Sequence, residues 1–155
     1  VGGRWNDRIQ QLKSTSTIAS ATLPQAVVAE LLASGDYDRH LRRIRPRYAA
    51  STAVMGQAVA RSFPPGTCVT RPNGGYVLWV EMPEEVDALK LYESALAAGI
   101  SIAPGPLFSA KQRYRHFVRL NAAWWSAQLA DAVDELGRIA HRLHGLAGRR
   151  RRSRA

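Results

Sequence analysis

The sequence is poor in the residues on which disulfides and metal centres depend. It has one cysteine, Cys68, among its 155 residues, so no disulfide can form within the chain, which is typical of proteins from a reducing cytoplasm. His141 and His144 lie three residues apart, but no cysteine or acidic residue stands at metal-ligand spacing from them. We therefore predict a cytoplasmic protein that binds no metal.

Long apolar runs and nucleotide-binding motifs are also missing. No run approaches the roughly 20 apolar residues that a membrane-spanning helix needs. Residues 1–7 lack the apolar core of a signal peptide, so we expect no contact with a membrane. No glycine-rich phosphate loop is present, and no serine, histidine and aspartate stand in an order that indicates a nucleophile. We therefore assign no catalytic residue within this chain.

Negative charge is scarce as well, since 12 acidic residues stand against 22 lysines and arginines and the formal net charge is +10. The excess is concentrated in two places, with five arginines in residues 149–154 and five in residues 39–47. A basic tail attracts the phosphates of nucleic acid without reading sequence, so nucleic-acid binding is one hypothesis. The alternative is a solvated, disordered tail, which is the more frequent meaning of a charge run.

Three helices are predicted in the first part of the chain, over residues 5–13, 23–34 and 38–62. Thr22 is a candidate N-cap for the second helix, since its hydroxyl can accept a hydrogen bond from the free N–H groups of the first turn. Pro46 lies inside the third helix and should kink or break it. The second helix is expected to bury an apolar stripe, made of Val27, Val28, Leu31 and Leu32.

The rest of the chain alternates strands with helices. Residues 67–71 and 76–82 are β-rich and flank Pro-Asn-Gly-Gly, a hairpin signal because asparagine and glycine tolerate positive φ. This pattern predicts a mixed α/β layer with helices on one side of a small sheet. The other expected elements are a helix at 87–98 that packs inward through Leu89, Tyr92 and Leu96, with Leu91 as a further candidate, strands at 100–103 and 116–121, and a closing helix at 126–145.

Arg119 is the most informative residue of the chain. It stands between Val118 and Leu120 in a strand pattern, and a guanidinium in an apolar run is costly to bury without a partner. A carboxylate fits a guanidinium well, because two parallel hydrogen bonds can hold it. The open alternative is an arginine on the solvent-facing side of an edge strand.

Five segments in sequence order resemble one known family. They are Leu-Pro-Gln at 23–25, Tyr-Asp-Arg-His-Leu-Arg-Arg at 37–43, Gly-Gly-Tyr-Val-Leu-Trp at 74–79, Ala-Pro-Gly-Pro-Leu-Phe at 103–108 and Arg-Leu-Asn at 119–121. Together they closely resemble the C-terminal part of fold-type I pyridoxal-phosphate (PLP) enzymes, the class I/II aminotransferases. Within that group they look most like the aminotransferase-like half of MocR-type regulators of the GntR superfamily.

The resemblance implies an α/β fold, namely the C-terminal small domain of the PLP-dependent transferase (aspartate aminotransferase-like) fold plus trailing helices of the large domain. Residues 1–37 would be the remnant of the large PLP-binding domain, and residues 38–63 the inter-domain linker helix. Residues 64–145 would form the small domain, and residues 146–155 a basic disordered tail. We therefore expect the chain to be a fragment of a longer protein that forms a homodimer.

The resemblance also implies a ligand site. Arg119 would hold the α-carboxylate of an amino-acid-type ligand. Residues 103–108, which include Pro104 and Gly105, would form part of the mouth of the site, with a plain strand-to-loop turn as the alternative. Tyr76 and Trp79 are weaker candidates for aromatic side chains near the substrate. Because they are three residues apart in a strand, they should point to opposite faces of the sheet.

The cofactor implied by the resemblance is PLP, and most of its site is expected outside this chain. Ser20 and Thr22 would contact the PLP phosphate of a neighbouring subunit, although helix capping and an ordinary Ser/Thr-rich connection explain them equally well. PLP chemistry needs a lysine that forms a Schiff base with the cofactor, and we expect that lysine upstream of Val1. No lysine of the chain stands in the Ser-x-x-Lys context of the family, and the three are Lys13, Lys90 and Lys111.

Three functions follow as hypotheses. In the first, the chain is the effector-sensing part of a MocR/GntR-type regulator, which would reach DNA only through an upstream winged-helix domain. In the second, it is a fragment of a stand-alone PLP-dependent aminotransferase. In the third, it is a nucleic-acid-binding protein that uses its basic tail. In the first two we expect the isolated chain to be inactive.

Overall fold

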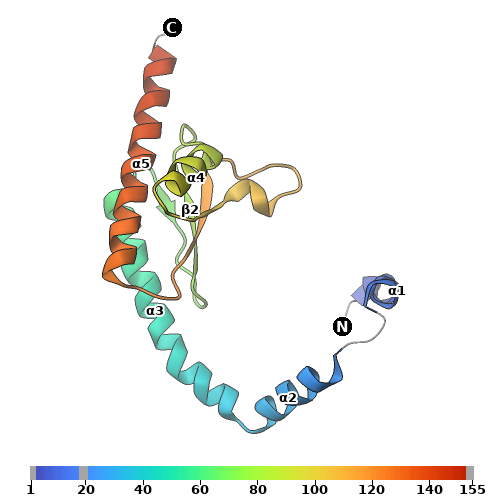
Figure 1. The fold of residues 1–155 in the computed structure, drawn as a ribbon. Coiled ribbons are helices and arrows are strands. Elements are labelled where there is room, and N and C mark those ends of the chain that lie inside the picture. The colour runs from blue at the N-terminus through green and yellow to red at the C-terminus, as the bar shows by residue number, and fades with distance from the viewer. Residues whose placement is uncertain (1–2, 18–20, 153–155) are drawn as a thin grey trace. The chain divides into compact units, whose positions relative to one another are not determined.

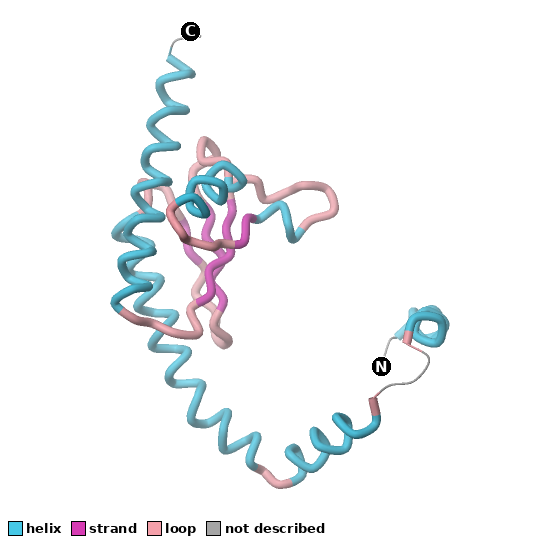
Figure 2. The backbone as a smooth tube through the Cα atoms, in the orientation of Figure 1, coloured by secondary structure: helices cyan, strands magenta, loops and turns pink. Residues whose placement is uncertain are grey.

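The computed structural model describes residues 3–17 and 21–152, and it contains two compact units (Figure 1). The first unit comprises residues 1–42 and the second comprises residues 43–155. The described part of the first unit consists of helices and their connections, whereas the second combines helices with a sheet (Figure 2).

The first unit contains a short 3-10 helix, η1 (Gly3–Trp5), and the helices α1 (Asn6–Ser16) and α2 (Thr22–Ala33). These elements confirm the first two predicted helices. Thr22, however, is the first residue of α2 and not its cap, because Ala21 occupies the cap position with extended dihedral angles. Alanine has no side-chain acceptor, so the predicted capping hydrogen bond is absent at this helix.

The apolar stripe predicted on α2 is exposed in this chain. No residue of α2 is buried, and the side chains of Val27, Val28, Leu31 and Leu32 are all exposed. Hydrophobic periodicity identifies the helix and its apolar side, but burial requires a second surface that covers that side. The prediction of a buried stripe is therefore wrong for this chain.

The helix α3 (Asp36–Ser62) runs without interruption through Pro46, so of the two predicted outcomes, a kink or a break, the break does not occur. A proline inside a helix costs about 3 kcal/mol through a lost hydrogen bond and a steric clash. Burial of side chains such as Met55 and Val59 on the second half of α3 offsets this cost. The helix ends before Phe63-Pro64-Pro65-Gly66, as the sequence predicts.

The second unit is built on a four-stranded antiparallel sheet with the order β1-β2-β4-β3. The predicted hairpin is confirmed as the pair β1 and β2, in which Cys68 lies opposite Glu81. The strands are β1 (Cys68–Val69), β2 (Val77–Glu81), β3 (Ala103–Pro104) and β4 (Phe117–Asn121).

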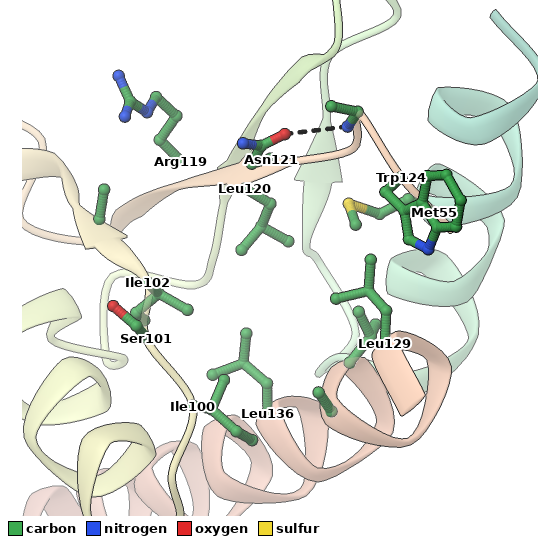
Figure 3. A pocket seen from close by; sticks show the side chains of 14 residues that line it. Met55, Ile100, Ser101, Ile102, Arg119, Leu120, Asn121, Trp124, Leu129 and Leu136 are labelled. Atoms are coloured by element: carbon green, nitrogen blue, oxygen red, sulfur yellow. Dashed lines mark hydrogen bonds between the residues drawn. The ribbon is translucent and has the colours of Figure 1, made fainter. Parts of the chain in front are cut away.

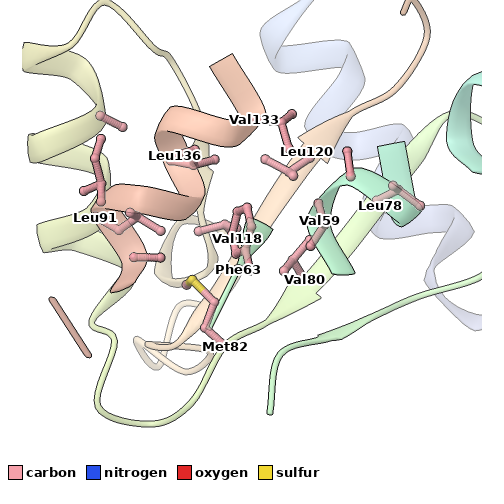
Figure 4. Close-up of a cluster of buried hydrophobic side chains, with 14 of the residues drawn as sticks. Val59, Phe63, Leu78, Val80, Met82, Leu91, Val118, Leu120, Val133 and Leu136 are labelled. Carbon is pink, nitrogen blue, oxygen red and sulfur yellow. The ribbon is translucent and has the colours of Figure 1, made fainter. Parts of the chain in front are cut away.

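Helices cover one face of this sheet (Figure 4). Leu78 and Val80 of β2, with Val118 and Leu120 of β4, alternate into the core beneath them. Burying an aliphatic side chain of this size contributes about 1.5–3 kcal/mol. The helices α3, α4 (Ala88–Ala97) and α5 (Ala127–Arg152) supply the opposing side chains, among them Met55, Val59, Leu91, Val133, Leu136 and Ile139.

The buried face of α4 differs from the predicted one. Ala88, Leu91 and Ala95 are buried, whereas the predicted Leu89 and Leu96 are exposed. The alanines lie three and four residues from Leu91 on the same side of the helix. Small side chains let the backbone of α4 approach its neighbours closely, and the larger leucines then stay on the solvent side.

Asp87, at which the sequence pattern begins this helix, is the N-cap of α4. Its carboxylate accepts hydrogen bonds from the N–H groups of Leu89 and Lys90 at 3.0 and 3.3 Å. Arg115 donates a further hydrogen bond at 2.9 Å. Burial raises the pKa of the Asp87 carboxyl, but these three donors together lower it by more, so its pKa lies below the ordinary value of 3.8.

Replacing Asp87 by alanine is expected to lower the free energy of unfolding by about 0.5–2 kcal/mol at neutral pH. Because the pKa is depressed in the folded state, the stabilisation is present above pH 3.8 and disappears as the pH falls through the lower, folded-state pKa. Urea unfolding of the wild type and of Asp87→Ala at neutral and at strongly acidic pH measures this. Glu93→Ala, on the exposed side of the same helix, should change little at either pH.

The closing helix α5 is longer than predicted. The sequence predicts that this helix ends at Gly145 and that a disordered tail begins at residue 146. In the structure the helix continues to Arg152. One glycine inside a helix costs about 1 kcal/mol, which good helix formers on either side can absorb. The tail prediction is therefore wrong for residues 146–152, while residues 153–155 lie outside the described part of the chain.

Candidate functional site

The face of the sheet that the helices leave open carries Arg119. Within β4, Val118 and Leu120 are buried whereas Arg119 is exposed. The pairing register places Arg119 opposite Trp79 on β2 and opposite Ala103 on β3. Figure 3 shows the side chains of Arg119 and Leu120 extending to opposite sides of β4. Since β4 has a neighbour on each side, Arg119 faces solvent from a central strand and not from an edge strand.

Four aromatic side chains gather on the same face, and we call them the outer aromatic cluster. The Trp79 ring lies 5.5 Å from Phe108 and 5.6 Å from Tyr114, both edge-on, and 5.6 Å from Phe117 in a stacked arrangement. Such pairs contribute about 0.5–1.5 kcal/mol each beyond their buried area. The cluster therefore forms a packed floor beside Arg119, although it lies outside the core.

The Arg119 guanidinium lies against this cluster and has no anionic partner among the described side chains. Its central carbon is 4.7 Å from the centroid of the Phe108 ring, within the roughly 6 Å range of a cation–π contact. Within residues 3–17 and 21–147, where side chains are described, no ion pair or hydrogen bond to Arg119 is present. Its N–H donors are therefore available to an anion from outside the described chain.

Pro104 and Gly105 adjoin Arg119, because β3 pairs with β4 and Pro104 lies opposite Val118. Both residues are buried. A Cβ atom added to Gly105 would lie 2.2 Å from the carbonyl oxygen of Tyr114 and 2.9 Å from that of Phe117. The glycine is therefore explained by the close crossing of two backbone segments. Contact of either residue with a ligand remains a prediction.

Substituting Gly105 by alanine is expected to cost about 1–3 kcal/mol of unfolding free energy, because rigid backbone atoms block the new methyl group. The matched control is Gly74→Ala, where an added Cβ meets nothing within 4 Å. Urea unfolding curves of the two variants should separate clearly. Equal stabilities would contradict the close approach at Gly105.

A cavity of 510 Å³ lies on the other side of β4, between the sheet and α5 (Figure 3). The strand backbone at Arg119 borders this cavity, whereas the guanidinium of Arg119 extends away from it (Figure 3). The guanidinium and the cavity are therefore separate features. The cavity walls are mainly apolar and include Met55, Ile102, Leu120, Leu129 and Leu136.

The described residues do not build a PLP site by themselves. Ser20 lies outside the described residues, and Thr22 is exposed at the start of α2, in the first unit. Each lysine is exposed as well, on α1, on α4 or in the loop before β4, and none follows a Ser-x-x pattern. Among the described residues there is also no cluster of histidine, cysteine, aspartate or glutamate that could hold a metal ion. No described helix is long and apolar enough to cross a bilayer.

Sequence reasoning named Arg119 and Trp79 and placed Phe108 in the segment at the mouth of the site, but it missed Tyr114 and Phe117. Tyr76 and Trp79 diverge as expected, since the Tyr76 ring contacts Tyr48 of α3 at 4.8 Å while Trp79 joins the cluster. Phe117 could have been found, because it lies two residues from Arg119 on the same strand face. Tyr114 comes from the loop before β4, for which the sequence carries no periodic signal.

A protein-family model and several known proteins match the sequence of this chain. The model described as aminotransferase class I and II matches residues 4–136. An uncharacterized HTH-type transcriptional regulator of Escherichia coli, YdcR, is 36% identical over 90% of this chain and 30% of its own length. A 2-aminoadipate transaminase of Thermus thermophilus is 31% identical over 84% of this chain and 33% of its own length. The chain thus spans about a third of the length of such relatives.

Solved structures give the same fold. The α-aminoadipate aminotransferase LysN of Thermus thermophilus, complexed with N-(5'-phosphopyridoxyl)-L-leucine, matches 90% of this chain and 37% of its own, with 30% identity and a TM-score of 0.73. A kynurenine aminotransferase of Pyrococcus horikoshii matches 88% of this chain and 34% of its own, with a TM-score of 0.77 at 23% identity. The predicted aspartate aminotransferase-like fold is confirmed.

Proposed function

Because this chain belongs to the aminotransferase class I and II family, we propose that it is the C-terminal part of a PLP-dependent aminotransferase-like domain. In the intact protein this part binds the α-carboxylate of an amino-acid-type ligand through Arg119. PLP and the lysine that bonds to it are contributed by the remaining two thirds of the domain. We place the intact protein in the cytoplasm, which the single exposed Cys68 supports. We also propose that the intact protein is a homodimer.

This proposal rests on the guanidinium of Arg119. It lies on the open face of the sheet and has no ion pair or hydrogen bond among the described residues. A guanidinium presents a planar fork of N–H donors that matches the two oxygens of a carboxylate. A charge-assisted contact of this kind contributes about 1.5–3 kcal/mol. The outer aromatic cluster beside Arg119 favours a ligand with an apolar portion, since its rings offer apolar surface next to the charge.

A regulator is the favoured parent. Two uncharacterized HTH-type transcriptional regulators of Escherichia coli, YdcR and YjiR, are 36% and 32% identical to the chain, each over 90% of its length. We infer that the domain senses an effector for a MocR/GntR-type regulator whose winged-helix domain binds DNA. A stand-alone aminotransferase is the second candidate, supported by the 31% identity to 2-aminoadipate transaminase. A winged-helix domain encoded upstream in the same reading frame would identify the parent as a regulator, and its absence would favour the stand-alone aminotransferase.

The ligand part of the proposal is tested with two matched probes on the intact protein freed of cofactor. N-(5'-phosphopyridoxyl)-L-leucine carries a carboxylate, and N-(5'-phosphopyridoxyl)-3-methylbutylamine is the same molecule without it. Isothermal titration should show about 10- to 150-fold tighter binding of the carboxylate probe, the equivalent of one charge-assisted contact. Equal affinities, or no binding of either probe, would reject the proposed site.

A further inference from the structure

Phe108 is the aromatic residue that touches the guanidinium. It is the last residue of η2 (Gly105–Phe108), the short 3-10 helix that follows β3. Its ring centroid lies 4.7 Å from the central guanidinium carbon of Arg119. This contact holds the cation through its charge and uses none of its N–H donors. The N–H groups of Arg119 thus remain available while the side chain is held in place.

The ring of Phe108 contacts a second aromatic ring, and the backbone of η2 that carries it is confined. Trp79, which lies opposite Arg119 in the sheet, contacts Phe108 edge-on at 5.5 Å and an interplanar angle of 77°. At the other end of η2, Gly105 fits against the backbone of Tyr114 and Phe117, which leaves no room for a side chain. A ring braced in this way can define where a neighbouring cation rests.

An arginine side chain is flexible, and holding it in one geometry costs rotamer entropy. If part of that cost is met before a ligand arrives, the ligand binds more tightly. The exposed Arg119 has no ion pair or hydrogen bond to restrain it within the described residues. Among those residues, the Phe108 ring makes a contact that can limit its motion.

We propose that Phe108 is a positioning residue, which holds the Arg119 guanidinium in place for the carboxylate of an amino-acid-type ligand. The inference rests on the proposed function of Arg119. It assigns to Phe108 an effect on the preference for a carboxylate and not on the core, since the residue is 44% exposed and supports little of the core.

The test compares Phe108→Leu with Phe108→Tyr in the intact protein, using the two phosphopyridoxyl probes. In Phe108→Leu the preference for the carboxylate probe should fall about twofold to fivefold, the size of an exposed cation–π contact. Any contact of Phe108 with the apolar portion, which the two probes share, should change both affinities alike and leave their ratio unaffected. Phe108→Tyr keeps an aromatic face and should retain the full preference.

The outcomes separate the two ideas. If Phe108→Leu weakens both probes equally, or leaves the preference intact while Arg119→Ala abolishes it, Phe108 has only a packing role and the inference is overturned. If Arg119→Ala leaves the preference intact, the proposed function of Arg119 fails first and the inference fails with it. Loss of preference in Phe108→Tyr as well as in Phe108→Leu would also contradict a role for the aromatic face.

Discussion

Replacing Arg119 by alanine in the intact protein is expected to abolish the preference for a carboxylate ligand. The guanidinium is exposed and has no partner among the described residues, so its removal leaves no buried charge behind. The loss should be about 10- to 150-fold for the carboxylate probe, which corresponds to 1.5–3 kcal/mol. Binding of the decarboxylated probe should not change, because that probe makes no contact with the guanidinium.

Two further variants make this result specific. Arg119→Lys keeps the positive charge but loses the two-pronged geometry, so the preference should fall to an intermediate value. Arg113→Ala removes another exposed arginine from the preceding loop, and it should leave both affinities unchanged. If Arg119→Ala and Arg113→Ala weakened the carboxylate probe equally, general positive charge and not a specific anchor would explain the binding.

The position of Arg119 shows what a sequence can supply about a site. Alternation along Phe117–Asn121 predicts which side chains share a face, and the structure confirms Val118 and Leu120 as core residues. The central place of β4 did not follow from that pattern, since strand order depends on pairings distant in sequence. The sequence places the segment that ends at Phe108 near the same site, but the contact of its ring with the Arg119 guanidinium did not follow from it, because that contact depends on how η2 leaves β3.

The helices show the same limit at the level of packing. Periodicity located α2 and α4, yet it did not say which side of α4 is buried or whether anything covers α2. In α4 the deciding residues are Ala88 and Ala95, whose small size lets the helix come close. A hydrophobicity pattern gives little weight to alanine, so it favoured the larger leucines.

Gly137 in α5 lies at another close approach that the sequence does not reveal. A Cβ atom at this position would lie 2.3 Å from the carbonyl oxygen of Ser62 and 2.9 Å from its Cβ. Ser62 ends α3, and its hydroxyl donates a hydrogen bond to Asp134 on α5. The C-terminal end of α3 thus meets the interior of α5 at a point where neither backbone can easily move away.

Gly137→Ala is therefore expected to destabilise the second unit by about 2 kcal/mol, since overpacking outweighs the gain in helix propensity. Gly145→Ala provides the matched control in the same helix, because an added Cβ there meets nothing within 4 Å. That substitution should instead raise the free energy of unfolding by about 0.5–1 kcal/mol. Urea unfolding of the two variants should give shifts of opposite sign relative to the wild type. If both variants were stabilised, the contact between α3 and α5 would have to be looser than 2.3 Å implies.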